Sequence, residues 1–248
     1  MIVTTSNPIS WIARALRTGE TSLLPGKLPA YTRLDAATKE AAVRRGVGRT
    51  TVQPFSNGDA AGTDLEEPVN LIVKGPLPRL QATLEQAGWV EAQSRSLPHY
   101  LHTALSALFK LGNYNGAPVS QQFLDGRGEA LALNKNSDHN RARDHLRVYA
   151  LPADPVTGEQ RWGIAATRDI ALSLTTKGHV DLGHAIDYGV DGERDQIMAD
   201  LLRVGVKQWA AVRGVRPQAK DVQVPGGVLA GGKYLTDGLV YEVSLTSR

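Results

Sequence analysis

The stretch DHLRVYAL, residues 144–151, alternates polar and apolar side chains. Successive side chains of a β-strand point to opposite faces of a sheet, so Leu146 and Val148 share one face. His145 and Arg147 share the other. This pattern predicts a strand whose apolar face packs in the core. Its polar face is either a solvated sheet surface or the floor of a cleft, where histidine beside arginine suits anion binding or proton transfer.

Further strand and helix patterns lie on both sides of this strand in the sequence. Runs typical of strands occur at residues 69–75, 129–135, 161–168, 170–174 and 238–245. Apolar side chains recur at helical spacing in residues 77–89, 99–112 and 193–205. Clustered strands with helices at both ends are typical of the α+β class. We therefore expect a mostly antiparallel sheet packed against helices.

The first 65 residues read as a helical N-terminal extension. Residues 7–19 have Asn7 as an N-cap and Gly19 as a stop, and Asp35 caps a second expected helix that ends at Gly46. The following segment, 53–68, is rich in Gly, Asn, Asp and Pro, which is typical of a linker. The expected organisation is an extension and linker over 1–65 and an α+β domain over 66–248.

One side of the first expected helix carries an apolar stripe made of Trp11, Ile12, Ala15 and Leu16. An apolar stripe on a helix has to be covered, either by the rest of the chain or by another molecule. A membrane-protein partner that binds through this helix is therefore one expectation.

Composition narrows the classes of protein. The 248 residues contain no cysteine, which excludes disulfides and thiolate chemistry. No apolar run reaches the ~18 residues of a membrane span, and no signal peptide is visible at the N-terminus. The net charge of +3 is too small to indicate a nucleic-acid partner. We expect a cytoplasmic protein, or one peripheral to the cytosolic side of a membrane.

The segment AATRDIAL, residues 165–172, places Arg168 and Asp169 in an otherwise small and apolar stretch. Adjacent strand residues face opposite sides, so the two are not a simple ion pair. Either they mark a turn between two strands, or one of them is held inside a site, where a buried charge needs a partner.

The segment GHAIDYGVDGERDQI, residues 183–197, concentrates acids before an expected helix. Asp191 suits the N-cap and Glu193 the first helical turn, where the helix dipole favours acids. That interpretation leaves His179, His184 and Asp187 unexplained. A loop with these residues could hold a divalent metal ion, so the candidate ligands are His184, Asp187 and Asp191.

Several segments together resemble the LssY C-terminal domain (LssY-like) family. They are AGWVEA, APVSQQFLDGR, DHLRVYAL, AATRDIALSL, GHAIDYGVDGERD and YLTDGL, within about three-quarters of the chain, residues 68–245. The resemblance implies a domain that often accompanies membrane portions of the DedA-like or lipid-phosphatase type. Family members tend to carry paired histidines where this chain has His184 and Ala185, and this departure weakens a metal interpretation.

The resemblance also implies that the polar residues of these motifs meet in one pocket: His145, Arg168, Asp169, His184, Asp187, Asp191, Glu193, Arg194 and Asp237. A buried charge network that merely fixes the fold is the alternative. Two functions remain open. The first is a soluble accessory or binding module of a membrane-envelope system, which recognises a polar, anionic ligand through Arg147, Arg168, Arg194 and Asp237. The second is a metal-dependent hydrolase with His145 and Asp169 as catalytic residues beside the candidate metal.

These two functions predict different geometries. The hydrolase requires His145, His184 and Asp187 within metal-ligand reach of one another in an open cleft. The binding module requires arginine side chains that face a cleft, with the two histidines apart.

Overall fold

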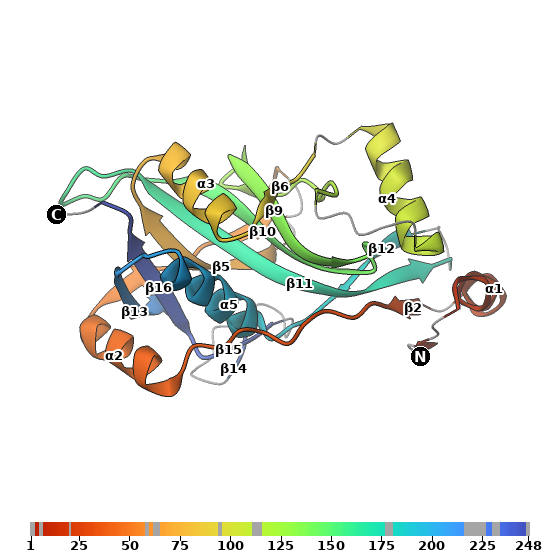
Figure 1. Cartoon of the computed structure of the whole chain (residues 1–248), viewed down its shortest axis with the longest axis horizontal. Helices are drawn as coiled ribbons and strands as arrows, with labels where there is room; N and C mark the ends of the chain where they lie inside the picture. The colour runs from red at the N-terminus through yellow and green to blue at the C-terminus, as the bar shows by residue number, and fades with distance from the viewer. Residues whose placement is uncertain are drawn as a thin grey trace.

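The computed structural model describes residues 3–4, 7–19, 21–57, 60–61, 65–93, 96–110, 116–176, 181–215, 227–229 and 234–246, although for a few of them only the backbone is described. A long, twisted sheet runs through the molecule, and helices lie at its flanks and at one end (Figure 1). The fold is α+β, as the sequence predicted.

The sheet has one main path of strands. In spatial order these are β3 (Thr50–Val52), β13 (Gln208–Val215), β16 (Leu239–Ser244), β5 (Leu65–Lys74), β11 (Arg161–Thr175), β10 (Ala142–Leu151), β9 (Leu131–Asp138) and β6 (Val90–Glu91). Neighbours on this path are antiparallel, except that β3 pairs with β13 and β16 with β5 in parallel. The expectation of a mostly antiparallel sheet is confirmed.

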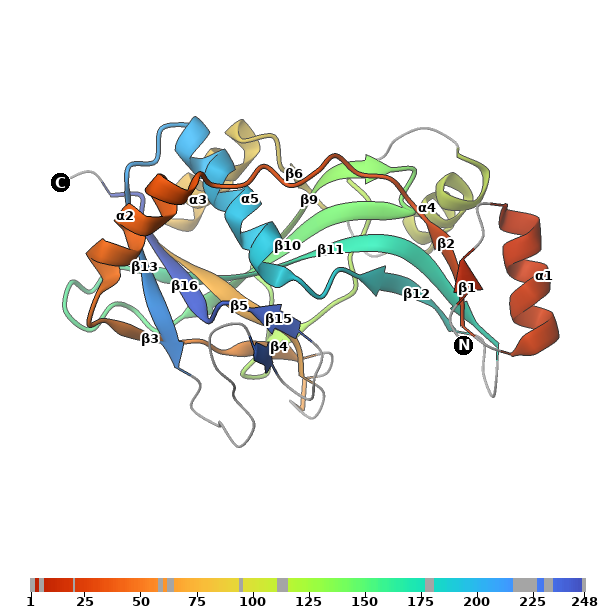
Figure 2. The same cartoon turned by 90° about the horizontal axis from the view of Figure 1, so that it is seen from below.

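Three helices cover one face of this sheet: α2 (Ala36–Gly46), α3 (Leu77–Gln86) and α5 (Val190–Arg203) (Figure 2). The main core lies between them and the strands. Leu146 and Val148 of β10 pack in this core with Leu80 of α3 and Ile197 of α5. The alternation in β10 therefore divides the strand as predicted, with one face in the core and the other turned toward a different environment.

Residues before position 65 add strands to the same sheet. After β1 (Val3–Thr4) and α1 (Pro8–Thr18), β2 (Ser22–Pro25) pairs with the far half of β11. Asn7 caps α1 by accepting hydrogen bonds from the backbone at positions 9 and 10, and Gly19 ends it with a φ of 66°. The connection from β2 to α2 then crosses the helix-bearing face (Figure 2). The extension is thus tied to the body by backbone pairing.

Two local predictions are wrong. Residues 161–175 form one continuous strand, β11, so Arg168 and Asp169 do not mark a turn. The expected metal loop is largely a strand, β12 (Asp181–Ile186), which pairs with β11. Its glycine and histidine give it little intrinsic strand propensity, and pairing with a long neighbour overrides that preference. His179 lies outside the described residues.

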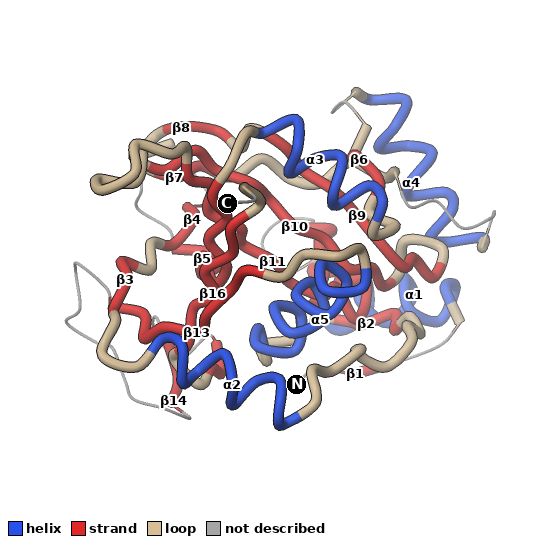
Figure 3. Tube along the Cα trace, turned by 60° about the vertical axis from the view of Figure 1, so that its left-hand side comes forward, coloured by secondary structure: helices blue, strands red, loops and turns tan. Residues whose placement is uncertain are grey.

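Short elements complete the structure. β4 (Phe55–Asn57), β7 (Phe123–Leu124) and β8 (Arg127–Gly128) make a small ladder beside β5 (Figure 3). β14 (Gly227–Leu229) pairs with β15 (Tyr234–Thr236). The remaining helix, α4 (Leu97–Phe109), lies with α1 at one end of the sheet. None of the described helices is long and apolar enough to cross a membrane.

Candidate functional site

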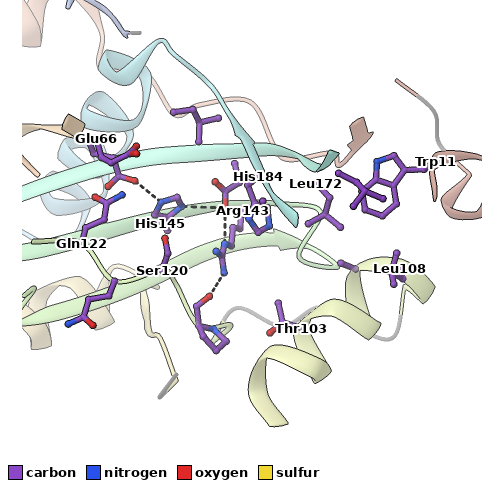
Figure 4. A pocket seen from close by; sticks show the side chains of 18 of the residues that line it. Trp11, Glu66, Thr103, Leu108, Ser120, Gln122, Arg143, His145, Leu172 and His184 are labelled. Atoms are coloured by element: carbon purple, nitrogen blue, oxygen red, sulfur yellow. Dashed lines mark hydrogen bonds and ion pairs between the residues drawn. The ribbon is translucent and has the colours of Figure 1, made fainter. Parts of the chain in front are cut away.

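A cavity of about 950 Å³ lies against the face of β10, β11 and β12 that points away from the main core. Its two ends differ in chemistry (Figure 4). The polar end is lined by Glu66, Glu67, Arg143, His145, Arg147, Asp169 and His184. The apolar end is lined by Trp11, Ile12, Leu16, Ala107, Leu108, Leu172 and Leu174. The polar face of β10 is therefore a cleft floor and not a solvated surface.

Strand register brings the polar side chains together. His145 of β10 lies opposite Thr167 of β11, and Arg143 lies opposite Asp169. Side chains two residues apart on a strand share a face, so both pairs point the same way. Glu67 reaches them from β5, the next strand along, and completes the floor of the cavity.

Glu67 is the centre of the first cluster. Both of its carboxylate oxygens accept from Nη1 of Arg147 at 2.6 Å. Oε1 also lies 3.1 Å from Nε2 of His145 and accepts from the Thr167 hydroxyl at 3.0 Å. Burial alone would raise the pKa of Glu67, but Arg147 and then His145 outweigh it and hold that pKa well below its usual range. Glu67 is thus an ionised, buried carboxylate with several donors.

Asp169 is the centre of the second cluster. Its Oδ2 accepts from Nε of Arg143 at 2.9 Å, and it lies 3.6 Å from Nδ1 of His145 and 3.8 Å from Nδ1 of His184. Burial opposes ionisation, but the positive charges that His184 and His145 carry when protonated, together with that of Arg143, lower the pKa of Asp169 to about 2. The structure therefore brings His145, a predicted catalytic residue, and His184, a predicted metal ligand, to the carboxylate of Asp169, the other predicted catalytic residue.

Each histidine presents Nδ1 to this carboxylate. Nε2 of His184 lies 3.2 Å from the backbone oxygen of Asn140, which can only accept, so Nε2 carries the proton. Burial lowers the pKa of His184 and so favours the neutral ring, in which Nδ1 is an acceptor beside the Asp169 carboxylate. Nδ1 of His145 is buried and has no hydrogen-bond partner among the described residues.

The apolar end is built by α1, α4 and β11. Trp11, Ala15, Leu24, Ala107, Leu172 and Leu174 form one buried cluster there. The indole N–H of Trp11 donates to the backbone oxygen of Ser22 at 2.7 Å, which fixes α1 against β2. Figure 4 shows Trp11, Leu172 and Leu108 together, separated from the charged residues near His145. Three residues of the stripe predicted on α1, Trp11, Ile12 and Leu16, therefore line the apolar end of the cavity.

Arg168 does not line the cavity. It points to the opposite face of β11, where Nε and Nη2 donate to Asp144 at 2.5 and 3.0 Å. Nη1 donates to the backbone oxygen of Pro29, and the guanidinium stacks on the Tyr31 ring at 3.7 Å. The prediction that Arg168 and Asp169 face opposite sides is confirmed, and each has a partner. Arg168 fastens the connection between β2 and α2 to the sheet.

Glu193 belongs to the same side of the sheet as Arg168. The sequence suggested a helix-start acid, yet the side chain is fully buried and lies 3.8 Å from Nε of Arg168. Burial and the neighbouring carboxylate of Asp144 raise the pKa of Glu193 well above its usual value. Glu193 is therefore harder to ionise than an exposed glutamate. Asp191 was expected to be the N-cap of α5, but Gly189 is the N-cap and Asp191 lies in the first helical turn.

Arg194 and Asp237 form a third cluster, outside the cavity. The guanidinium of Arg194 contacts both oxygens of Asp237 at 2.8 and 3.0 Å, and it also pairs with Asp191 and Asp195. Lys39 of α2 reaches Asp237 at 3.0 Å. Burial opposes ionisation of Asp237, but Arg194 lowers its pKa below the usual range. These pairs fasten α2 and β16 to α5.

The predicted metal ligands do not converge. His184 lines the cavity, whereas Asp187 accepts from the Tyr31 hydroxyl at 3.0 Å and from the backbone of Gly189. Asp191 accepts from the backbone of Asp237 and from the Thr236 hydroxyl. Over the described ranges, no group of three or more histidine or acidic side chains is arranged to hold a metal ion. Neither predicted geometry is met in full. The two histidines lie together, as the hydrolase requires and contrary to the expectation for the binding module, but Asp187 lies elsewhere.

Sequence reasoning missed Glu67, Arg143 and Thr167. Glu67 falls in the segment interpreted as a linker, although it precedes Val69 and Leu71 at strand spacing. Arg143 lies two residues before His145, on the same face of β10, so predicting a longer strand would have placed Arg143 on the polar face. Thr167 lies in the segment AATRDIAL, but only the charged residues of that segment were considered as site candidates.

Comparison with known proteins gives a family. No curated protein and no solved structure matches the chain significantly. A model of one protein family, described as LssY C-terminus, matches residues 55–240, which include the whole of β10, β11 and β12. This match spans well over half of the chain. The chain belongs to the LssY C-terminus family.

Proposed function

We propose that this chain is a binding module for an amphipathic small molecule, acting within a membrane-envelope system of the kind that the family resemblance implied. The observation that carries the proposal is the cavity itself, which joins a charged end to an apolar end in a single space of about 950 Å³. Small-molecule sites range from ~300 to ~1,000 Å³, so there is room for a polar head and a long chain.

The walls of the cavity are organised before any ligand arrives. Arg147 donates to Glu67 and Arg143 donates to Asp169, so the polar end needs no rearrangement to keep these charges paired. Preorganised walls reduce the entropy lost on binding. At the apolar end, each methylene taken out of water contributes about 0.8 kcal/mol.

The hydrolase alternative has less support. Thr167 is the hydroxyl nearest to Nε2 of His145, at 3.0 Å, but it is fully buried, donates to Glu67 and does not line the cavity. A nucleophile has to reach the substrate. The predicted metal ligands Asp187 and Asp191 are engaged with other partners, so a metal-activated water has no described triad of ligands.

The surface near the apolar end suits a membrane-linked role. Ile9 and Leu16 of α1 are 79% and 68% exposed, and Phe109 of α4 is 65% exposed. Arg14 and Arg17 lie on the same helix. The earlier expectation of a membrane-protein partner at α1, and of a place peripheral to the membrane, stays part of the proposal on these grounds.

Fluorescence titration with the neutral dye N-phenyl-1-naphthylamine tests the proposal. The dye brightens in apolar surroundings, and we expect saturable binding to the wild-type chain. Thr103 of α4 lines the cavity, so Thr103→Trp should fill part of it and weaken dye binding about tenfold, or ~1.4 kcal/mol.

The matched control is His102→Trp, because His102 is its neighbour on α4 and is exposed outside the cavity. This variant should bind the dye like the wild type. Absence of saturable binding, or equal weakening in both variants, would contradict the proposal.

A further inference from the structure

We infer that the polar end of the cavity selects a head group that donates hydrogen bonds and carries no negative charge, such as a hydroxyl or an ammonium group. This inference rests on the proposed function, because it names the head of the ligand that the same cavity would hold. It replaces the anionic ligand expected from the sequence.

The charge of the cavity wall is the first argument. Three carboxylates line the cavity, those of Glu66, Glu67 and Asp169, against two guanidinium groups, those of Arg143 and Arg147. Arg143 is paired with Asp169 and Arg147 with Glu67, so the two guanidinium charges are already balanced by carboxylates. A negatively charged head would therefore enter a space lined by more carboxylates than guanidinium groups. Contact between like charges at short range costs several kcal/mol of binding free energy.

The second argument is that both arginines are already paired with carboxylates. Arg147 directs Nη1 at both oxygens of Glu67, and Nε and Nη2 at the backbone oxygen of Ser120. Arg143 donates to Asp169 through Nε and to the backbone of Pro118 through Nη1. An anion that took over the Nε donor of Arg143 or the Nη1 donor of Arg147 would displace a buried carboxylate, which would then lose its own partner.

The third argument concerns the acceptors. Nδ1 of His184 is a lone-pair acceptor on the cavity wall, since Nε2 of that ring carries the proton toward Asn140. The Asp169 carboxylate lies 3.8 Å from it. Nδ1 of His145 lies 3.6 Å from the same carboxylate and has no hydrogen-bond partner among the described residues. A hydroxyl or ammonium group can donate to acceptors clustered in this way, and a carboxylate head cannot.

Dodecanol, dodecylamine and dodecanoate share one apolar chain and differ only in the head, so they separate these contributions. Each is titrated against wild-type protein loaded with N-phenyl-1-naphthylamine, and displacement of the dye is measured. We expect dodecanol and dodecylamine to displace the dye at least about tenfold better than dodecanoate. His184→Phe removes the acceptor and, once the affinity of the variant itself for the dye has been measured, should weaken the alcohol and the amine about three- to tenfold more than it weakens dodecanoate.

The exposed residue His102, outside the cavity, provides the control, and His102→Phe should leave all three affinities unchanged. Displacement by dodecanoate that equals or exceeds that of the other two overturns the inference and leaves the proposed function standing. Equal weakening of all three compounds by His184→Phe overturns it as well. If none of the three displaces the dye and the dye itself does not bind, the proposed function fails first.

Discussion

Replacing Arg147 by methionine removes the strongest partner of the buried Glu67 carboxylate and keeps much of the aliphatic stem. The side chains of Arg147 and Glu67 are only 2% and 5% exposed, so water cannot take over the lost contacts. Removing one partner of a buried ion pair costs about 3–5 kcal/mol. We expect about 3 kcal/mol here, because His145 and Thr167 still donate to Glu67.

The double variant Glu67→Gln/Arg147→Met supplies the comparison. A neutral amide needs no counter-charge, so the double variant should be destabilised by only about 1 kcal/mol, about 2 kcal/mol less than Arg147→Met alone. The single variant Glu67→Gln completes the cycle from which the coupling energy is calculated. Urea unfolding followed by tryptophan fluorescence measures all four proteins of this cycle. For a chain of this length, each kcal/mol corresponds to about 2–4 °C in Tm, so thermal melts provide an independent check.

The same cycle has a pH signature with a defined sign. Without Arg147, burial dominates and the pKa of Glu67 should rise above its unfolded value. An acid whose folded pKa is raised costs stability increasingly as pH rises above its unfolded pKa. The deficit of Arg147→Met should therefore be larger at mildly alkaline than at mildly acidic pH. Equal losses in the single and double variants, with no dependence on pH, would refute this account of the pair.

Two further predictions concern the opposite face of the sheet. Glu193 has a raised pKa beside Asp144, so folding takes up a proton and stability falls as pH rises above the unfolded pKa. Glu193→Gln stays neutral, so at alkaline pH its free energy of unfolding in urea should exceed that of the wild type by at least about 1 kcal/mol. Glu40→Gln, at an exposed position, should show no such gain. A Cβ on Gly192 would lie 2.7 Å from the Tyr31 ring, so Gly192→Ala should lower the free energy of unfolding by about 1–3 kcal/mol. In a Tyr31→Ala background the same substitution should instead stabilise α5 by up to about 1 kcal/mol. A loss of the same size in both backgrounds would disprove the contact.

The part of the fold set by local pattern could be predicted from the sequence. The alternation in β10 and the capping residues Asn7 and Asp35 depend on neighbouring residues only, and the structure confirms them. Side-chain periodicity and capping chemistry act within a few positions of the chain. The α+β class followed from the order of these elements.

The site could be predicted only in part, because strand register and long-range pairing determine it. His145, Asp169 and His184 were identified as candidates and do lie together. Arg168 and Arg194 carried the same signal in the sequence, yet they lie on other surfaces and bind their own carboxylates. A charged residue in an apolar stretch indicates burial with a partner, but not whether the partner is another side chain or a ligand.

The pairing of β2 with β11 has a consequence for any shortened version of this chain. The family match begins at residue 55, whereas Ala171 to Leu174 of β11 find backbone partners in residues 22–25. A protein that starts at the family boundary would leave the edge of β11 opposite β12 without a neighbouring strand, so that its peptide groups could pair with a second molecule. Edges of this kind promote strand exchange and aggregation. The unit recognised by sequence similarity is thus smaller than the unit that closes its own sheet.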